Sequence, residues 1–263
     1  MPSAEIPVQW SDDDREFTRR RAAPRNVKLA EQVARDIAEG IFTRNLVAGA
    51  RLPSERLMLD RFGVSRGTLR EALRILEMQG LIVVRAGPGG GPVVVSMTPE
   101  DFNRVASLHY KSAAATVRDL WKARMDIEPV LARRAAEELT PETTKTLTDL
   151  LERSRHTTVD NDGDFIRVGS TFHRVIAYTS GNPILDLMAR SLGEMTAYLE
   201  SAAVFPPESR DNVHRDHQAI VKAILAGNAK RAERLMRDHM AEMLASHAQR
   251  FPGSLDSLLP YVI

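Results

Sequence analysis

Apolar residues in the first third of the chain recur at helical spacing and predict a run of short helices. Leu29, Val33 and Ile37 repeat every fourth residue, which indicates an amphipathic helix at about 27–43. The chain then turns within VAGARLPSER. A second helix is expected to start near Pro53–Ser54, because proline and serine both suit a helix N-terminus.

A third helix follows Gly63, which is expected to end the second one. Ser65 can cap the N-terminus of SRGTLREALRILEMQG, and Gly80 can close its C-terminus. The β-branched segments LIVV and PVVV then flank the glycine-rich AGPGGGP. This arrangement predicts two short strands joined by a flexible loop, a wing-like hairpin.

From about residue 100 onward the hydrophobic pattern predicts only helices, separated by proline, glycine and asparagine. Six are expected, at 116–139, 141–156, 163–179, 183–204, 208–226 and 228–247. Short connections between six helices are typical of an all-α bundle. The expected fold is therefore mostly α, with three helices and a hairpin first and a helical bundle second.

The pattern divides the 263 residues into two domains and three connecting or terminal segments, and this length suits two domains. The expected parts are a mobile arm (1–26), a helical unit with the hairpin (27–97), a linker (98–115), the bundle (116–249) and a loosely packed tail (250–263).

The composition narrows the class of protein. Aromatic residues make up only 5% of the chain, so the core must rest on aliphatic side chains, which favours helices over a β-sandwich. Cysteine is absent, which excludes disulfides, cysteine-ligated zinc and a thiol nucleophile. No apolar run reaches the roughly 20 residues of a membrane span, and the N-terminus lacks a signal-peptide core. We therefore expect a soluble cytoplasmic protein without a membrane partner.

Charge is concentrated in one segment although the whole chain carries only +1. Residues 18–95 contain fourteen Lys and Arg against seven Asp and Glu, a net charge of +7. Residues 1–17 come to −4 and residues 96–263 to −2. An arginine-rich segment points to a polyanionic partner, with a solvated basic face as the alternative.

The third helix carries the arginines in a row. At 100° per residue Arg66, Arg70 and Arg74 share one face, beside the apolar stripe that faces inward. A guanidinium group matches guanine O6 and N7 and also neutralises phosphate, so this row suits reading of the DNA major groove.

The start of the same helix suits contact with DNA as well. Gly67 keeps it slim enough to approach the bases, and the hydroxyls of Ser65 and Thr68 can bond phosphate near the helix N-terminus.

The stretch LPSERLMLDRFGVSRGTLREALRILEMQGLI resembles the winged helix-turn-helix of GntR-family bacterial transcription regulators, over about 28–95. This resemblance implies that the operator contacts are Arg56, Ser65, Arg66, Thr68 and Arg70, in addition to the close approach at Gly67. It also implies that the wing near Arg85 and Gly87 enters the minor groove. The wing sequence GPGGGPVV departs from the family's usual ending.

Four polar residues interrupt apolar stripes of the predicted bundle: Arg124, His173, His217 and His239. A buried arginine needs a partner, either a protein acid or an anionic ligand. Three imidazoles from three helices could hold a divalent metal such as zinc or nickel. Alternatively, each histidine could be an ordinary hydrogen-bonded core residue.

The segments RMDIEPVLARRAA, FHRVIAYTSGNPIL, HQAIVKAILAGN and AERLMRDHM resemble the FCD ligand-binding domain of the FadR-type branch of that family, over about 116–247. In metal-binding members the ligands match His173, His217 and His239, together with an aspartate whose position is Gly169 here. Arg124 matches an arginine that faces the carboxylate of small-acid effectors. Other members, such as those that respond to acyl-CoA, bind their ligand without metal.

The sequence therefore predicts a homodimeric transcription regulator and not an enzyme. It would be a repressor that binds a pseudo-palindromic operator and responds to an organic acid or acyl thioester. A metal-dependent hydrolase is one alternative, but the chain lacks an HExxH-type arrangement. An architectural DNA-binding protein without effector is another. Fusion to a pyridoxal-phosphate enzyme is not expected, because the 168 residues that follow the wing are too few for an aminotransferase-like domain.

Overall fold

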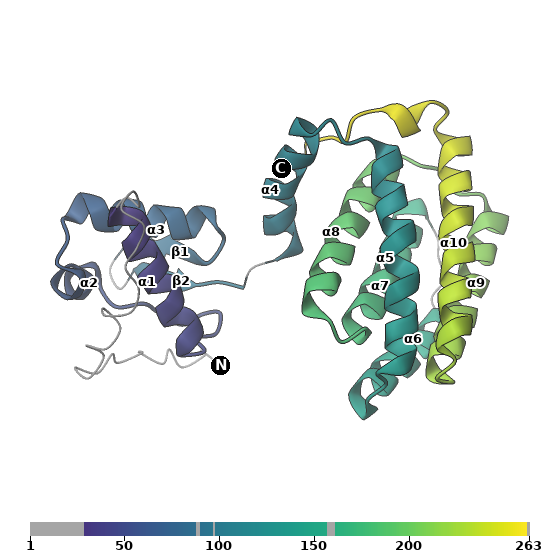
Figure 1. Cartoon of the computed structure of the whole chain (residues 1–263), viewed down its shortest axis with the longest axis horizontal. Helices are drawn as coiled ribbons and strands as arrows, with labels where there is room; N and C mark the ends of the chain where they lie inside the picture. The colour runs from purple at the N-terminus through teal and green to yellow at the C-terminus, as the bar shows by residue number, and fades with distance from the viewer. Residues whose placement is uncertain (1–28, 88–89, 97, 157–160, 262–263) are drawn as a thin grey trace. The chain divides into compact units, whose positions relative to one another are not determined.

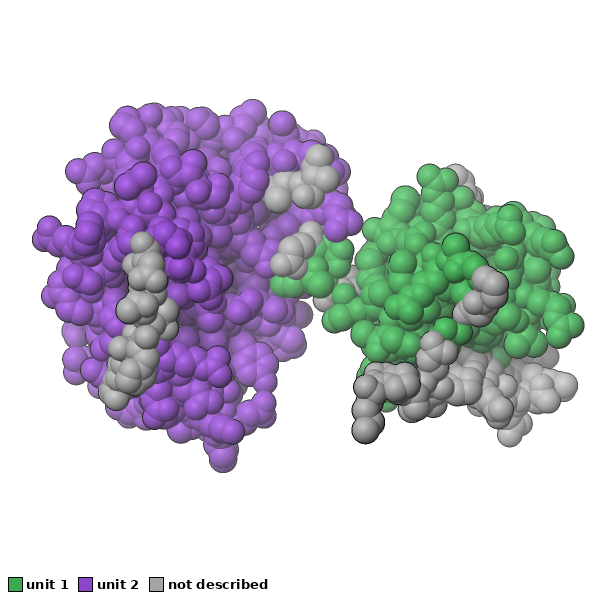
Figure 2. Space-filling model, turned by 180° about the vertical axis from the view of Figure 1, so that it is seen from behind, with its two compact units in different colours: residues 1–101 green, residues 102–263 purple. Residues whose placement is uncertain are grey.

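The computed structural model describes residues 29–87, 90–96, 98–156 and 161–261. The chain divides into two compact units, Met1–Asp101 and Phe102–Ile263, which Figure 2 colours separately. The expected arm at 1–26 lies outside the described residues. Across the described ranges, every helix is too short or too polar to pass through a membrane.

Between residues 29 and 96, the described part of the first unit contains three helices and a two-stranded antiparallel hairpin, as the sequence predicts (Figure 1). In the hairpin, Ile82 pairs with Val94 and Arg85 pairs with Gly91. The elements are α1 (Leu29–Thr43), α2 (Glu55–Phe62), α3 (Arg66–Met78), β1 (Ile82–Arg85) and β2 (Gly91–Val94).

Local capping determines the turn between α2 and α3. Gly63 ends α2 with φ +63°, and its amide donates a hydrogen bond to the carbonyl oxygen of Leu59. Ser65 then caps α3, since its hydroxyl oxygen accepts a hydrogen bond from the amide of Thr68. The inward face of α3 includes the fully buried Leu69. This capped turn fixes which face of α3 is left outside.

The second unit is a helical bundle built around α5 (Val117–Glu137), which packs against four other helices of the unit. Figure 1 shows α5 beside α10 along most of its length, and their contact is the most extensive in the bundle. The core includes Trp121, Leu131, Ile176 and Ile220. The six predicted helices are observed as α5, α6 (Pro141–His156), α7 (Asp162–Thr179), α8 (Pro183–Glu200), α9 (Pro207–Leu225) and α10 (Ala229–Arg250).

The segment 98–115, expected to be a linker, contains a further helix, α4 (Pro99–Ser112). Its polar Asn103 is buried against α8, where the side-chain amide donates to the Ser191 carbonyl at 3.3 Å and to Glu194 Oε2 at 2.9 Å. Phe102 and Val105, by contrast, are exposed. Ala106 is buried, but most of the larger apolar side chains face outward, so the usual apolar-inward pattern does not mark this helix in the sequence.

The C-terminal segment, expected to be loosely packed, contacts the start of α5 instead. Leu259 is buried, and its amide donates to the carbonyl of Ala115 at 2.9 Å. The amide of Val117 in turn donates to the carbonyl of Ser257 at 3.0 Å. The segment includes a 3₁₀ turn at Ser254–Asp256. The segment is therefore part of the bundle.

Candidate functional site

The outer face of α3 exposes the predicted arginine row. Arg66, Arg70 and Arg74 are all exposed, and Arg70 Nε lies 3.1 Å from Glu55 Oε1 of α2. The hydroxyl oxygens of Ser65 and Thr68 lie 2.9 Å apart at the helix start. Gly67 lies between them and is also exposed. The start of α3 therefore presents amides, hydroxyls and guanidinium groups together.

The other sequence-predicted DNA contacts are exposed too. Arg56 lies on α2, and Arg85 ends β1. Gly87 follows in the hairpin loop with φ +97°, a conformation that favours glycine, while residues 88 and 89 lie outside the described residues. The hairpin is attached to α3, because Glu77 Oε1 accepts the Val84 amide at 2.9 Å. This bond holds the wing and the arginine row in one piece.

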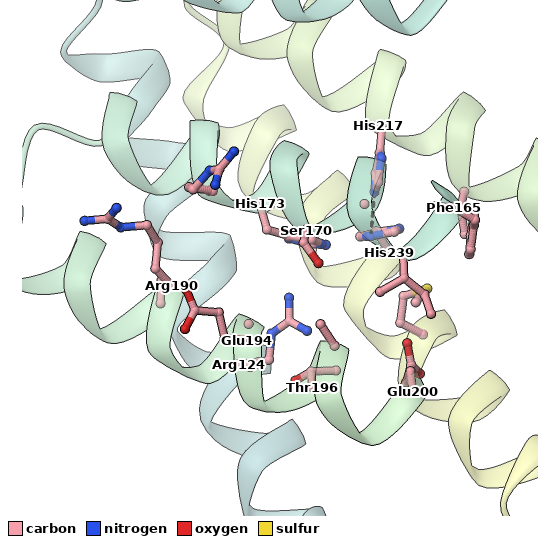
Figure 3. A pocket seen from close by; sticks show the side chains of 18 residues that line it. Arg124, Phe165, Ser170, His173, Arg190, Glu194, Thr196, Glu200, His217 and His239 are labelled. Atoms are coloured by element: carbon pink, nitrogen blue, oxygen red, sulfur yellow. Dashed lines mark hydrogen bonds between the residues drawn. The ribbon is translucent and has the colours of Figure 1, made fainter. Parts of the chain in front are cut away.

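The bundle contains a partly open cavity of about 100 Å³ between α5, α7, α8, α9 and α10 (Figure 3). All four polar residues predicted from the apolar stripes line it. Gly169, Ser170, Thr196 and several charged side chains complete the polar part of the wall. The charged residues are Arg124, Arg174, Arg190, Glu194 and Glu200.

Three histidines from three helices meet in this cavity, as Figure 3 shows. Each of His173 (α7), His217 (α9) and His239 (α10) offers one ring nitrogen, and these atoms lie within 4.8 Å of one another. The Nε2 atoms of His217 and His239 are 3.2 Å apart. The ring of Phe172 stacks on His217 at 3.6 Å between centroids and fixes its plane.

The spacing fits a divalent metal. Tetrahedral zinc with Zn–N bonds near 2.1 Å holds its ligand nitrogens roughly 3.4 Å apart. The 3.2 Å pair already meets this value, and a small side-chain shift brings in His173. Burial lowers the pKa of His173 and of His217, so both rings are neutral and keep a lone pair for a metal.

Glu128 joins the arginine to the histidines. Its Oε1 accepts hydrogen bonds from Arg124 Nε at 3.1 Å and Nη2 at 2.7 Å, while Oε2 lies 3.0 Å from His173 Nδ1. Burial would raise the pKa of Glu128, but the hydrogen bond from His173 and the charge of Arg124 hold it below its usual range. Glu128 is therefore ionised and acts as an acceptor on both sides.

A second buried network lies at the wall near the C-terminal end of α8. Glu200 lines the cavity, and its Oε1 lies 3.3 Å from His247 Nδ1 and 2.9 Å from Arg250 Nη2. His247 also contacts the ring of Trp121, with centroids 5.4 Å apart. These bonds tie α8 to the end of α10.

Gly169 leaves an open place beside the histidines. It lies one turn before His173 on α7 and lines the cavity, and a Cβ placed on it would meet no atom within 4 Å. A metal on the histidines would thus need its remaining ligand from water or from a bound molecule.

Sequence reasoning missed Glu128 although the signal was available. The buried Arg124 required a partner, and Glu128 follows four residues later on the same helix face. Glu194 and Glu200 also line the cavity without having been singled out. Neither lies on an apolar stripe that would have marked it.

Comparisons with known proteins match both units. The family model described as bacterial regulatory proteins, gntR family, matches residues 29–91, and that of the FCD domain matches residues 119–242. The HTH-type transcriptional repressor NanR of Cronobacter sakazakii is 30% identical over 232 residues, which cover 83% of this chain and 85% of that protein. The chain belongs to the GntR family.

Further relatives agree with this assignment. NanR of Escherichia coli K12 is 30% identical over 230 residues, with 83% of this chain and 84% of the relative covered. The solved structure of Streptococcus agalactiae GntR has a TM-score of 0.64 at 24% identity, covering 81% of this chain and 98% of that one, which supports the fold. The chain is thus a GntR-type transcription regulator with an FCD domain and not an enzyme, which removes the hydrolase alternative.

Proposed function

We propose that this regulator is a dimeric repressor whose operator binding is modulated by a small organic acid bound in the FCD cavity. The observation that carries the proposal is the convergence of three histidines and Arg124, itself held by Glu128, on one cavity. Its relatives named NanR are repressors, and the same role is proposed for this chain.

At the DNA end, α3 would enter the major groove. Arg66 and Arg70 would bond base edges, and Ser65 and Thr68 would bond phosphate at the helix start, where Gly67 allows close approach. Arg56 would contact the backbone, while Arg85 and Gly87 of the wing would reach the minor groove. Two copies related by a two-fold axis would occupy the two half-sites of a pseudo-palindromic operator.

At the ligand end, His173, His217 and His239 would hold one divalent metal, zinc or nickel. The metal would supply positive charge and an open coordination position for a carboxylate. Arg124 would bind the same carboxylate from the α5 side of the cavity. The cavity volume of about 100 Å³ favours a compact acid over the long acyl chain of a thioester.

The energy required is modest. A hundredfold change in operator occupancy needs about 2.7 kcal/mol of differential ligand binding between the two arrangements of the DNA-binding units. Contacts of an ionised carboxylate with a cation contribute about 1.5–3 kcal/mol each. One acid held by a metal and Arg124 therefore suffices.

Metal analysis and DNA selection together test this function. Protein purified without a histidine tag should contain stoichiometric zinc or nickel. Selection from random duplex DNA should yield two inverted half-sites, and the protein should sediment as a dimer. Metal-free protein indifferent to chelator would redirect the search to acyl thioesters. Selected DNA without inverted symmetry, combined with a purely salt-driven affinity, would instead support the architectural alternative.

A further inference from the structure

Glu128 uses its two oxygens for two different tasks. Oε1 takes both hydrogen bonds from Arg124, and Oε2 takes the one from His173. Glu128 lies on α5 with its side chain 1% exposed, so water does not compete for either oxygen. Arg124 lies one turn before it on the same helix and His173 on α7. The same carboxylate therefore joins the anion-binding arginine to a metal-ligating histidine.

The contact with His173 determines which ring nitrogen can bind a metal. Oε1 of Glu128 accepts two hydrogen bonds from the Arg124 guanidinium, which favours the ionised carboxylate. An ionised carboxylate only accepts hydrogen bonds, so Nδ1 of His173 carries the hydrogen. The lone pair of the neutral ring is then on Nε2. Carboxylates in this position fix the ring and raise its basicity as a ligand.

The contact with Arg124 has the opposite effect on metal binding, which it weakens. Arg124 neutralises Glu128 and places a positive charge close to the metal-binding histidines. Like charges repel more strongly in a buried site than in water. A cation on the histidines would thus be attracted by Glu128 and repelled by Arg124.

We infer that Glu128 is a positioning residue that orients His173 for the metal and is shared with Arg124, so that the metal site and the acid site are coupled through one carboxylate. The inference rests on the proposed function. An acid that binds Arg124 draws its guanidinium away from Glu128. The negative charge of Glu128 is then no longer neutralised, and the affinity of the histidines for the metal rises. By reciprocity, bound metal tightens the acid.

Titration of the metal-free full-length protein with Zn²⁺, against a chromophoric chelator, tests this inference. Glu128→Gln keeps the shape of the side chain but loses its charge, and we expect a 10- to 100-fold weaker zinc affinity. Asp216→Asn is the matched control. Asp216 also faces a triad histidine, His239 Nδ1, but at 3.5 Å and with its side chain 37% exposed. We expect this control to change the affinity by less than threefold.

Arg124→Met supplies the test of sign. It imitates the withdrawal of Arg124 from Glu128, so zinc affinity should stay equal or rise severalfold. A purely structural role of the Arg124–Glu128 pair would instead weaken zinc binding in both variants. Circular dichroism checks folding, and Co²⁺ spectra at saturation should show the same ligand set in wild type and Glu128→Gln. If Glu128→Gln does not fold, Arg124→Met alone still distinguishes the two roles: unchanged or higher zinc affinity supports the shared carboxylate, and lower affinity supports a purely structural role.

The outcomes separate the inference from the function on which it rests. Zinc binding by the wild type with no loss in Glu128→Gln overturns the role of Glu128 and leaves the metal site intact. Weaker binding in Arg124→Met overturns the sharing of the carboxylate. A wild type that does not bind zinc overturns the metal-dependent function itself, and the inference with it.

Discussion

Gly169 allows the metal site to be strengthened by a single substitution. It lies in the interior of α7, four residues before His173, and a Cβ at this position meets no atom within 4 Å. Residues four apart share a helix face, so an aspartate here would place its carboxylate beside the histidines. Gly169→Asp should add a fourth protein ligand, and Gly169→Ala is the control that changes only the helix backbone.

The two variants differ in how their stability depends on zinc. Gly169→Ala should stabilise the bundle by about 1 kcal/mol with or without metal, because glycine is a poor helix former. Aspartate is up to about 0.7 kcal/mol less favourable than alanine in a helix, so Gly169→Asp should be the less stable variant in chelator. A tenfold tighter zinc site adds about 1.4 kcal/mol, which reverses the order at saturating zinc.

Thermal unfolding of both variants, with chelator and with excess zinc, measures this reversal. For a unit of this size 1 kcal/mol corresponds to about 2–4 °C in melting temperature. If Gly169→Asp stays below Gly169→Ala by the same margin in both conditions, the cavity next to Gly169 does not face a metal and the assignment of the site is refuted.

Three further predictions concern the two units separately. Arg66→Ala should lower affinity for the selected operator by about 1–3 kcal/mol with an unchanged melting temperature, and equal binding in a gel-shift titration would remove Arg66 from the interface. Leu69→Ala, at a fully buried position on the inward face of α3, should cost about 2–5 kcal/mol in denaturant unfolding of the first unit, so a loss below 1 kcal/mol would contradict the packing. At a free metal concentration one hundred times the dissociation constant, bound metal should add about 2.7 kcal/mol to the free energy of unfolding. Chelation should remove this contribution and lower the melting temperature of the second unit. His217→Ala should abolish that difference.

The helices whose ends are marked by local capping residues could be predicted from the sequence. Gly63, Ser65 and Gly80 punctuate the first unit where the structure ends or starts its helices. These residues act through their own backbone preferences and through bonds to near neighbours, so no tertiary information is needed. The same holds for the starts of α6 to α10, which have proline or asparagine at the first or capping position.

Features that depend on tertiary contacts could not be predicted in this way. The helix α4 buries Asn103 and exposes Phe102, because its inner face meets polar groups of α8. The C-terminal segment is held by two backbone hydrogen bonds to the start of α5. Its sequence has no apolar stripe, so the sequence alone predicts a loosely packed tail. In the cavity, the stripes identified the histidines and Arg124, whereas the double use of Glu128 requires knowing that α5 and α7 are neighbours.

The charges around the cavity connect the metal to the acid. Three buried or half-buried arginines at the cavity are already paired: Arg124 with Glu128, Arg190 with Asp186 at 3.1 Å, and Arg250 with Glu200 at 2.9 Å. The remaining lining arginine, Arg174, is exposed to solvent, which weakens the effect of its charge. An incoming carboxylate would thus add an uncompensated negative charge to a buried site, which is costly. The neutral histidines cannot offset it, but a divalent cation held by them can. Acid binding should therefore disappear with the metal, whereas binding of an uncharged thioester group would survive chelation.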